Sequence, residues 1–338
     1  MKAKRYVVGL FLFVISTLGF MVSAGPVDGQ HRPLIRKQGT IDCDVVETSP
    51  VVFKGILYRC EWARDINWLR KGHLEGKPNG NHSRLIDVNS GKTVASFAYG
   101  HIFSIAFVDG GTIYVTAASR DQYDEGRRIE VFASKDLKHW DHWTALDLKG
   151  FKIYNTSVCK TPDGFVLMFE IRYPKEQAGA PFTARFATSK DMHHWKLTPP
   201  ECVYAKDRYT APHCLRYLDG YFYNFYLEAH HGYETQVVRS KDLIHWEPSP
   251  LNPVLKASPE DKRILNNKLT SRQRRHIDAA EDTNNSDIDF CEFNGRLVIN
   301  YSWGNQRGVE FLAQAIYDGT EEDFLRGWFP NRNRKPKQ

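Results

Sequence analysis

A seven-residue motif that occurs three times constrains the fold of this chain most strongly. It has the form Ser-Lys-Asp-x-x-His-Trp and begins at Ser134, Ser189 and Ser240, so the spacings are 55 and 51 residues. A period of this size is typical of repeated supersecondary units, and the four-stranded blade of a β-propeller is the all-β candidate. The Ser and Asp side chains can bond nearby backbone amides and set a turn, while the Trp can cover the blade. We therefore interpret the motif as structural rather than catalytic.

A second repeated pattern raises the number of units to five. It consists of a short apolar strand, a turn with Gly, and a strand rich in aromatic and β-branched residues. Its copies begin at Glu47, Ile102, Asn155, Thr210 and Ser286. Residues 41–330 divided by five give 58 residues per unit, which is close to the spacing of the motif. The sequence therefore predicts an all-β fold, a single five-bladed β-propeller that spans residues 25–330.

Two stretches do not follow the repeat. Residues 64–92 have the composition of a polar loop inside blade one. In residues 259–282 apolar side chains recur among many charged ones, which favours a helix. We therefore predict a short helical insertion before the last blade, whose solvated face carries the basic run Arg272, Arg274 and Arg275.

The first 24 residues are typical of an export signal. A basic start is followed by an apolar run from Val7 to Val22 and by the small residues Ser23 and Ala24. The run is shorter than the roughly 20 residues that a membrane span needs. We therefore expect cleavage before Gly25, a secreted or periplasmic protein, and no membrane contact after cleavage.

Charge and composition narrow the class of partner. The chain is 41% hydrophobic and carries a net charge of +6. Without residues 1–24 and the basic C-terminal tail, residues 331–338, the net charge is −1. Nucleic-acid binding relies on a basic face that neutralises phosphates. The body of the chain lacks that surplus, so we expect no nucleic-acid partner.

Six cysteines remain in the predicted mature chain. Cys159, Cys214 and Cys291 occupy the same place in three repeats, which indicates small buried side chains. An exported protein can form disulfides, although a chain of this length does not need them for stability. Cys43 and Cys60 are the first candidate pair for a bridge.

A propeller would bring residues from all five blades to one end of its central channel. The inner strand of each blade starts at that end, and the second strand returns to it. Side chains alternate along a strand with a period of two, which selects one side of each strand. The predicted ring contains Glu47, Asn155, His213, Asp287 and Asp289 from the inner strands, and Arg120, Glu170, Arg172, Glu228 and Trp303 from the second strands.

The acids of this ring favour glycoside hydrolysis. Glu170 and Glu228 end strands that are otherwise almost wholly apolar or aromatic, so we expect raised pKa values for both. Cleavage of a glycosidic bond needs one protonated and one ionised carboxyl group beside the bond. We predict Glu228 as the proton donor and Glu47 or Asp287 as the base, in an exported hydrolase that acts on poly- or oligosaccharides.

The other ring residues are candidates for substrate binding. Aromatic side chains such as Trp303 could stack on sugar faces, and Arg172 and His213 could bind hydroxyl groups or a uronate carboxylate. Glu170, Asn155, Asp289 and Arg120 complete the predicted set. This chemistry requires no cofactor and no metal ligand. The oxygen-rich run from Asp282 to Asp287 could supply a Ca²⁺ in the central channel, but it lacks the spacing of an EF-hand, and Asx turns explain it equally well.

The repeated motif and the export signal together resemble the five-bladed β-propeller glycoside hydrolases, the superfamily around families 43, 32, 62 and 117. The resemblance covers nearly the whole predicted mature chain. Family 43 enzymes present an Asp base in blade one, a second Asp and a Glu acid, each at the start of an inner strand. Glu47 or the nearby Asp44 matches the first in kind, but Asn155 and Thr210 stand at the other two positions. The resemblance therefore implies a distant member that has either moved its acid, to Glu228 or Glu170, or lost hydrolysis.

Two alternatives to a hydrolase follow from the same residues. Asn155 and Thr210 suggest a non-catalytic carbohydrate-binding propeller. A sialidase-type propeller fits less well, because its turn motif, Ser-x-Asp-x-Gly-x-Thr-Trp, is one residue longer and contains a Gly and a Thr that the present motif lacks. The sequence leaves the sugar, the linkage and the oligomeric state open.

Overall fold

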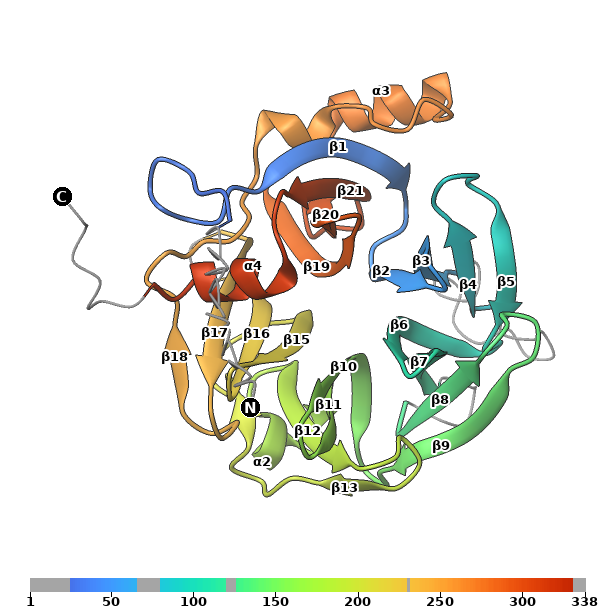
Figure 1. The fold of residues 1–338 in the computed structure, drawn as a ribbon, viewed down its shortest axis with the longest axis vertical. Helices are drawn as coiled ribbons and strands as arrows, with labels where there is room; N and C mark the ends of the chain where they lie inside the picture. Colours follow the sequence, from blue (N-terminus) through green and yellow to red (C-terminus); the bar gives the residue numbers. More distant parts are fainter. Residues whose placement is uncertain (1–24, 66–79, 120–125, 230–231, 331–338) are drawn as a thin grey trace, which may run out of the picture.

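Five β-sheets stand around a central axis in this protein (Figure 1). The structure, a computed structural model, describes residues 25–65, 80–119, 126–229 and 232–330. The predicted export signal and basic tail lie outside these residues. Each sheet begins with a strand beside the axis and continues outward through antiparallel neighbours. The predicted all-β fold, a five-bladed propeller, is confirmed.

Four of the blades follow the chain in order. Blade one contains β2 (Thr48–Phe53), β3 (Ile56–Ala63), β4 (His82–Asp87) and β5 (Thr93–Phe97). Blade two contains β6 (His101–Asp109), β7 (Thr112–Ser119), β8 (Arg128–Ser134) and β9 (Asp141–Asp147). Blade three contains β10 (Lys152–Thr161), β11 (Gly164–Tyr173), β12 (Thr183–Ser189), β13 (Trp195–Leu197) and β14 (Val203–Tyr204), with the short helix α2 (Lys175–Ala178) after β11. Blade four contains β15 (His213–Leu218), β16 (Tyr221–Glu228), β17 (Glu234–Ser240) and β18 (Trp246–Pro248).

Blade five is completed by a strand from the other end of the chain. It contains β19 (Asn284–Phe293), β20 (Arg296–Gly304), β21 (Glu310–Tyr317) and, outermost, β1 (Arg36–Cys43). β1 pairs antiparallel with β21, as the upper part of Figure 1 shows. Helix α4 (Glu321–Gly327) follows β21. Because strands from both ends of the chain share this sheet, it closes the ring.

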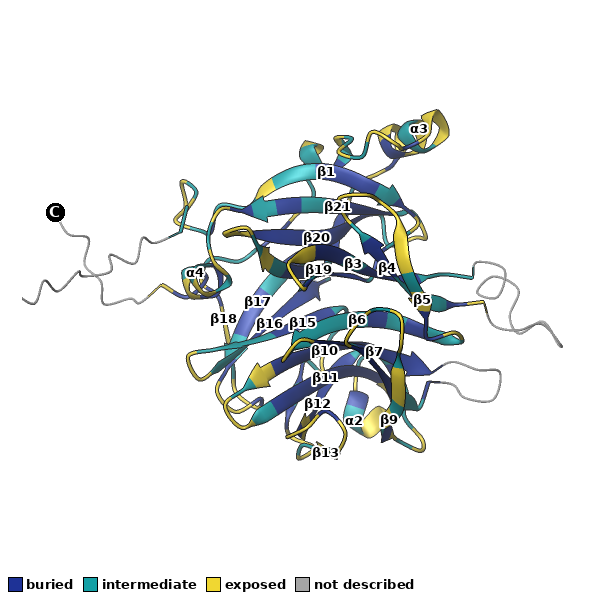
Figure 2. Cartoon of the chain, turned by 45° about the vertical axis from the view of Figure 1, so that its right-hand side comes forward, coloured by how far each residue is buried: buried dark blue, intermediate teal, exposed yellow. Residues whose placement is uncertain are grey.

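Burial follows the order of the strands within a blade (Figure 2). The second strands β11 and β20 are buried along nearly their whole length, whereas the outermost strands β5 and β9 are largely exposed. Apolar side chains pack between neighbouring blades, and the Phe225 and Phe290 rings of blades four and five lie 5.2 Å apart. Full burial of one such side chain stabilises a fold by about 1.5–3 kcal/mol. The core is therefore divided into layers between the blades.

The repeated motif forms the turn between the third and fourth strands of blades two, three and four. In blade two the Ser134 hydroxyl accepts hydrogen bonds from the amides of Asp136 and Leu137. The Asp136 carboxylate accepts hydrogen bonds from the amides of Lys138 and His139 and from the His139 ring. The amide and ring of His139, with the amide of Lys138, hold the pKa of Asp136 well below its usual range. All five bonds recur in blade four, and all but the one to the Ser hydroxyl from the amide three residues on recur in blade three, which supports the structural role of the motif.

The insertion before the last blade contains the 3-10 helix η1 (Pro259–Lys262) and the helix α3 (Ser271–Ala279). Thr270 caps α3, because its hydroxyl accepts a hydrogen bond from the amide three residues on. Arg272 and Arg275 are exposed on α3, whereas Arg274 is partly buried and donates hydrogen bonds to the carbonyls of Leu269 and Asn267, so only two of the three predicted residues form the solvated basic face. The predicted helical insertion is thus confirmed. None of the helices in the described residues is long and apolar enough to cross a membrane.

The prediction of a loop over residues 64–92 was wrong in part. Strand β4 lies within this range and pairs with both β3 and β5, so it belongs to blade one. Residues 66–79 lie outside the described residues. The composition of β4 is mixed, since Leu85 and Ile86 stand between charged neighbours. The strand is stabilised by pairing on both edges and by the full burial of Leu85. Its composition alone therefore does not predict a strand.

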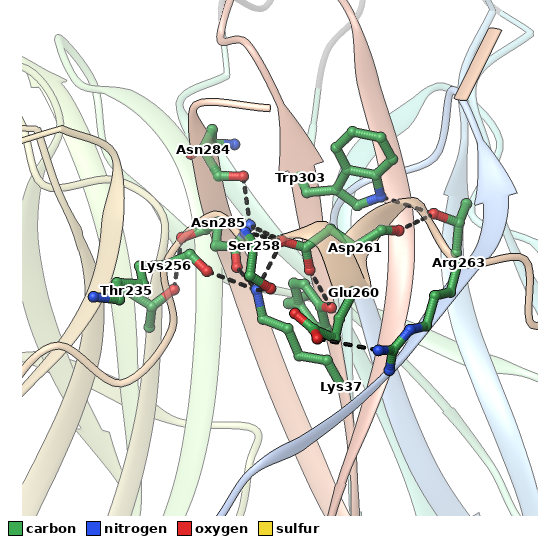
Figure 3. A network of polar contacts seen from close by, with 12 residues as sticks. Lys37, Thr235, Lys256, Ser258, Glu260, Asp261, Arg263, Asn284, Asn285 and Trp303 are labelled. Atoms are coloured by element: carbon green, nitrogen blue, oxygen red, sulfur yellow. Dashed lines mark hydrogen bonds and ion pairs between the residues drawn. The ribbon is translucent and has the colours of Figure 1, made fainter. Parts of the chain in front are cut away.

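A buried polar network fastens β1 to the insertion (Figure 3). Lys37 Nζ lies 2.7 Å from Asp261 Oδ2 and 2.5 Å from Asn285 Oδ1. It also donates hydrogen bonds to the carbonyl oxygen of Lys256 and the hydroxyl of Ser258. A buried ammonium group destabilises a fold by several kcal/mol unless acceptors surround it. These acceptors come from the segment just before η1, from η1 itself and from β19, so they fix the closing strand specifically.

All six cysteines are unpaired in the structure. The candidate bridge between Cys43 and Cys60 is therefore absent, because Cys43 ends the outermost strand of blade five and Cys60 lies in the second strand of blade one. The two side chains belong to separate apolar clusters. Cys159 and Cys214 are buried and Cys291 is partly buried at matching places in the inner strands, as their shared position in the repeat predicts.

Candidate active site at the mouth of the channel

The starts of the inner strands enclose a narrow cavity to which all five blades contribute. Its lining consists of Glu47, Thr48, Ile105, Asn155, Thr156, Ser157, Pro212, His213, Cys214, Asp287, Ile288 and Asp289. Of the ten predicted site residues, Glu47, Asn155, His213, Asp287 and Asp289 therefore meet at this cavity. The ring closure brings together side chains that lie far apart in the sequence.

β-bulges shape the inner strands at this end of the channel. The pairing register shifts in β6, β10 and β19, between Ile102 and Ile105, Ile153 and Thr156, and Ser286 and Asp289. Bulges add residues to one strand and change the direction of side chains, often beside active sites. Phe103 and Asp287 have φ of 57° and 53° there. Phe103, Tyr154 and Asp287 thus occupy equivalent positions in the three bulges. The alignment made from the sequence assumed regular strands without bulges, and it placed Ile102 and Asn155 at the position equivalent to Asp287.

Asp287 and Glu47 are two acids in different surroundings. The Oδ2 atom of Asp287 accepts hydrogen bonds from the hydroxyls of Ser286, at 2.6 Å, and Ser302. Burial and the nearby charge of Glu47 raise the pKa of Asp287 to about 7. Glu47 instead forms an ion pair with Arg64, whose Nη2 lies 3.1 Å from Glu47 Oε2. Such a difference between two carboxyl groups is how an acid and a base are separated in one site.

Glu310 is a third acid at the mouth, and sequence reasoning missed it. It starts β21, the third strand of blade five, and its carboxylate lies 3.3 Å from Arg64. Arg64 therefore bridges Glu310 and Glu47. Burial raises the pKa of Glu310, although the Arg64 charge opposes this shift. The predicted ring contained only first and second strands, and Arg64 fell in the predicted loop, so no sequence signal marked this bridge.

Glu170 organises the part of the cavity formed by blades three and four. It is fully buried, and its Oε1 accepts hydrogen bonds from the backbone amide of His213, at 3.0 Å, and from His213 Nδ1, at 2.9 Å. Its Oε2 accepts a hydrogen bond from Asn155 Nδ2 at 3.1 Å. The other His213 nitrogen lies 3.1 Å from the Thr210 hydroxyl. Glu170 is thus not isolated among apolar residues, and it positions two residues that line the cavity.

Glu228, the predicted proton donor, is not among the residues that line the cavity. Its side chain is largely buried, and its Oε2 lies 3.0 Å from Arg208 Nε. The Tyr226 hydroxyl lies 3.5 Å from the same oxygen. The apolar strand β16 therefore does not leave this carboxyl group isolated, because Arg208 provides a charged partner.

Asp289 lies farther along β19 than Asp287 and is paired with a partly buried cation. Arg216 donates a hydrogen bond to Asp289 and a second one to the carbonyl of Phe290, at 2.7 Å. Arg216 also lies 3.5 Å from Glu321. Asp289 and Arg216 line a second cavity that adjoins the first. A guanidinium in this position does not fit a Ca²⁺ ligand set around Asp289.

The remaining three predicted residues have separate positions. Trp303 is fully buried, its indole N–H donates a hydrogen bond to Thr40 at 2.9 Å, and its ring stacks on Phe311. The prediction that Trp303 stacks on a sugar is therefore wrong, since neighbouring strands of blade five cover it. Arg172 is exposed near the end of β11. Arg120 lies outside the described residues.

A series of aromatic rings crosses from blade one toward blade four. Successive ring centroids lie 4.3 to 5.9 Å apart in the order Trp62, Phe103, Tyr154, Phe182 and Tyr209. All but Trp62 are partly exposed. Burial and the charges of Glu170, Asp287 and Glu47 raise the pKa of Tyr209. The blade-four end of the series therefore lies beside the acids of the cavity.

Known structures share this fold, whereas the sequence matches no family model and no curated protein. A structure described as a glycoside hydrolase is 13% identical, with a TM-score of 0.55 over 90% of this chain and 96% of that one. The family 43 protein BlXynB from Bacillus licheniformis is 13% identical, with a TM-score of 0.53 over 83% of this chain and 54% of its own. A family 43 enzyme from Xanthomonas citri, solved with xylose, is 13% identical, with a TM-score of 0.51 over 84% of this chain and 90% of its own. The chain thus has the propeller fold of family 43 glycoside hydrolases and is distant from them in sequence, which confirms the resemblance at the level of the fold.

Proposed function

We propose that the protein is an exported glycoside hydrolase that cleaves poly- or oligosaccharides with Glu47 and Asp287. One observation carries the proposal: the two acids line the same cavity, but Asp287 has a pKa raised to about 7 and Glu47 is paired with Arg64. Glycosidic cleavage needs this combination of a protonated and an ionised carboxyl group. The fold shared with family 43 glycoside hydrolases supports it.

Asp287 is the proton donor in this mechanism. With a pKa of about 7, a large share of Asp287 is protonated at neutral pH. Both serine hydroxyls bond to Oδ2, so Oδ1 remains for proton transfer to the leaving-group oxygen. Glu228 is less suited to this role than the sequence suggested, because it pairs with Arg208 and does not line the cavity.

Glu47 is the carboxylate that either activates a water or attacks the anomeric carbon. An inverting reaction places the two carboxyl groups roughly 6.5–9.5 Å apart to leave room for the water, and a retaining one places them closer. Arg64 stabilises the charge on Glu47 and also contacts Glu310. Glu310 therefore shares the positive charge of Arg64 with Glu47 and adds a second negative charge near the base.

Unpartnered polar atoms and aromatic rings support sugar binding. Asn155 Oδ1 and Arg64 Nε, close to the proposed acids, are among several buried side-chain atoms of the described residues that have no hydrogen-bond partner. Each such group destabilises a fold by about 1–3 kcal/mol, and hydroxyl groups of a bound sugar would satisfy both. Phe103, Tyr154 and Phe182 offer partly exposed rings for stacking on sugar faces. These groups provide both polar and apolar contacts for a carbohydrate.

The proposed chemistry uses carboxyl groups and requires no cofactor. A Ca²⁺ in the central channel remains a prediction from the sequence, and no catalytic step depends on it. Cleavage of the export signal, a secreted or periplasmic location and the absence of nucleic-acid partners are likewise proposals.

A non-catalytic carbohydrate-binding propeller is the second candidate. It is favoured by Asn155 and Thr210, which stand where the resemblance to family 43 places acids. Glu170, the nearest acid in blade three, is fully occupied by His213 and Asn155. A binding protein would keep the cavity and its aromatic rings but would not turn over a substrate.

Release of reducing sugar from arabinans, agar oligosaccharides and pectic fragments separates the two candidates. We expect turnover of at least one substrate by the wild type and its loss in Asp287→Asn and Glu47→Gln. Glu228→Gln is the matched control, because it removes a largely buried carboxylate outside the cavity. Binding without turnover across the panel would favour the carbohydrate-binding protein, and full activity of both active-site variants would overturn the assigned pair.

A further inference from the structure

A second cluster of ligating side chains lies on blade two, apart from the channel cavity. His101 is the first residue of β6, Glu130 lies in β8 and His142 lies in β9. One ligand atom from each lies within 4.8 Å of the other two. Within the described part of the chain, these side chains form the one group of three or more His, Cys, Asp or Glu with this spacing. None of the three lines the proposed catalytic cavity.

The pairing of the strands holds the cluster together. Phe132 faces His142 in the β8–β9 ladder, and Glu130 faces Thr144 two positions away. The His142 ring stacks on Phe132 with centroids 4.4 Å apart, and the His101 ring meets the same Phe132 edge-on at 5.1 Å. One aromatic side chain therefore packs against both imidazoles and limits their rotation.

Further hydrogen bonds orient the ligating atoms. His101 Nδ1 donates to the Tyr99 carbonyl at 3.0 Å, so Nε2 of the neutral ring keeps its lone pair. The Thr144 hydroxyl donates to Glu130, and His142 Nε2 lies 3.0 Å from Glu130 Oε2. Outer hydrogen bonds of this kind fix the tautomer and direction of metal-binding histidines. Glu130 is buried, whereas the His142 side chain is 49% exposed, so an ion can reach the cluster from solvent.

We propose that His101, Glu130 and His142 bind Zn²⁺ or a similar divalent transition metal, with a fourth coordination position open to water. Two imidazoles and one carboxylate are a ligand set that suits zinc, and a fourth open position is usual with three protein ligands. Bonds of about 2.0–2.2 Å would bring the ligand atoms to roughly 3.3–3.6 Å from one another, which requires a small contraction of the cluster.

Metal binding changes the tautomer of one ring in this cluster. In neutral His142 the proton that Nε2 donates to Glu130 is given up to solvent and Nδ1 takes one up, so Nε2 can offer its lone pair to the ion and the ring stays neutral. Arg128 Nε lies 3.4 Å from Glu130 Oε1, and its positive charge opposes a cation. The three ligands therefore favour binding of the metal ion, and the guanidinium of Arg128 lowers the affinity.

Titration of the tag-free, chelator-treated protein with Zn²⁺, followed by calorimetry, tests the proposal. Co²⁺ provides an independent readout, because coordination by these ligands produces visible absorption bands. The test variants are His142→Ala, which alters a half-exposed side chain, and Glu130→Gln, which keeps the shape of the side chain. The matched control is His139→Ala, because this histidine is exposed on the same blade and lies in the turn motif. Thermal unfolding of each variant confirms that it is folded.

We expect one Zn²⁺ site in the wild type and in the control, and a loss of affinity of at least about tenfold in both test variants. Zn²⁺ should also raise the unfolding temperature of the wild type but not of His142→Ala, because a ligand that binds only the folded state stabilises it. Equal affinity in His142→Ala and His139→Ala would overturn the proposal, since binding would then lie elsewhere. Displacement of Zn²⁺ by an equal concentration of Ca²⁺ would also overturn it, because imidazole is a poor ligand for Ca²⁺.

Discussion

Two aspartates on one strand have opposite surroundings. Asp287 and Asp289 are two residues apart in β19, and both line the mouth cavity. Asp287 has serine hydroxyls as partners and a pKa raised to about 7 by burial and by Glu47. Asp289 is bonded to the guanidinium of Arg216. The comparison teaches that a buried acid becomes available for proton transfer when the fold supplies hydroxyls and a like charge rather than a cation.

The largest expected effect comes from removing Asp287, the proposed proton donor. Asp287→Asn should lower kcat/KM on the responsive substrate by about 10²–10⁴-fold, the usual contribution of a general acid. Asp289→Asn is the control, and its activity per folded molecule should stay within a few-fold of the wild type. Steady-state kinetics at pH 6 checks both variants. Equal losses in the two variants would remove the distinction between the aspartates.

The second effect concerns the partner acid. Glu47→Gln should reduce kcat/KM by about 10²-fold or more, because the proposed base is lost. It should also move the alkaline limb of the residual activity to lower pH. In the proposed mechanism Asp287 acts in its protonated form, and removal of the Glu47 charge lowers its pKa from about 7. A pH profile of the variant tests the sign, and a limb that moves to higher pH would contradict it.

The third effect is on stability rather than on activity. Asp289→Asn leaves the partly buried Arg216 without its closest charged partner, and breaking such a pair costs at most the roughly 3–5 kcal/mol of unfolding free energy that a fully buried pair would lose. Glu321 lies 3.5 Å from Arg216 and should keep the loss near the lower end. Urea unfolding measures it. The double variant Asp289→Asn/Arg216→Met should recover part of the stability, and no recovery would show that the unpaired charge is not the cause.

The smallest effect is the pH dependence of stability at Asp287. Its folded-state pKa is raised from 3.8 to about 7, so its protonated form favours the folded state. That contribution is fully present below about pH 4 and is lost as the pH rises through about 7. Relative to the wild type, Asp287→Asn should therefore gain unfolding temperature at pH 8 compared with pH 5. A difference between the two proteins that does not change with pH would contradict the raised pKa.

The repeat was sufficient to predict the fold, because its period and turn residues specify the blade. Ser134 and Asp136 bond the backbone of their own turn, so their role is local and visible in the sequence. Strand β4 was missed because its stability comes from neighbouring strands rather than from its own composition.

The site was predicted only in part, because alternation fails where strands bulge. Glu47 and Asp287 were predicted and lie at one cavity, but the bulges in β6 and β10 place Phe103 and Tyr154 at positions that a period of two does not predict. Tertiary partners caused the other differences. Arg208, the partner of Glu228, lies outside strand β16, so the sequence pattern of that strand does not predict the pair.

Blade five, which joins strands from both ends of the chain, determines at what point during folding the proposed site can form. Glu47 follows β1 by only a few residues, and Asp287 lies on β19 of the same blade, so both acids depend on the strand exchange between the chain ends. During synthesis β1 emerges long before β21, and it must wait for its partner. We therefore expect the two acids to meet only after β1 has paired with β21, so the proposed hydrolysis would begin only once the ring of blades has closed.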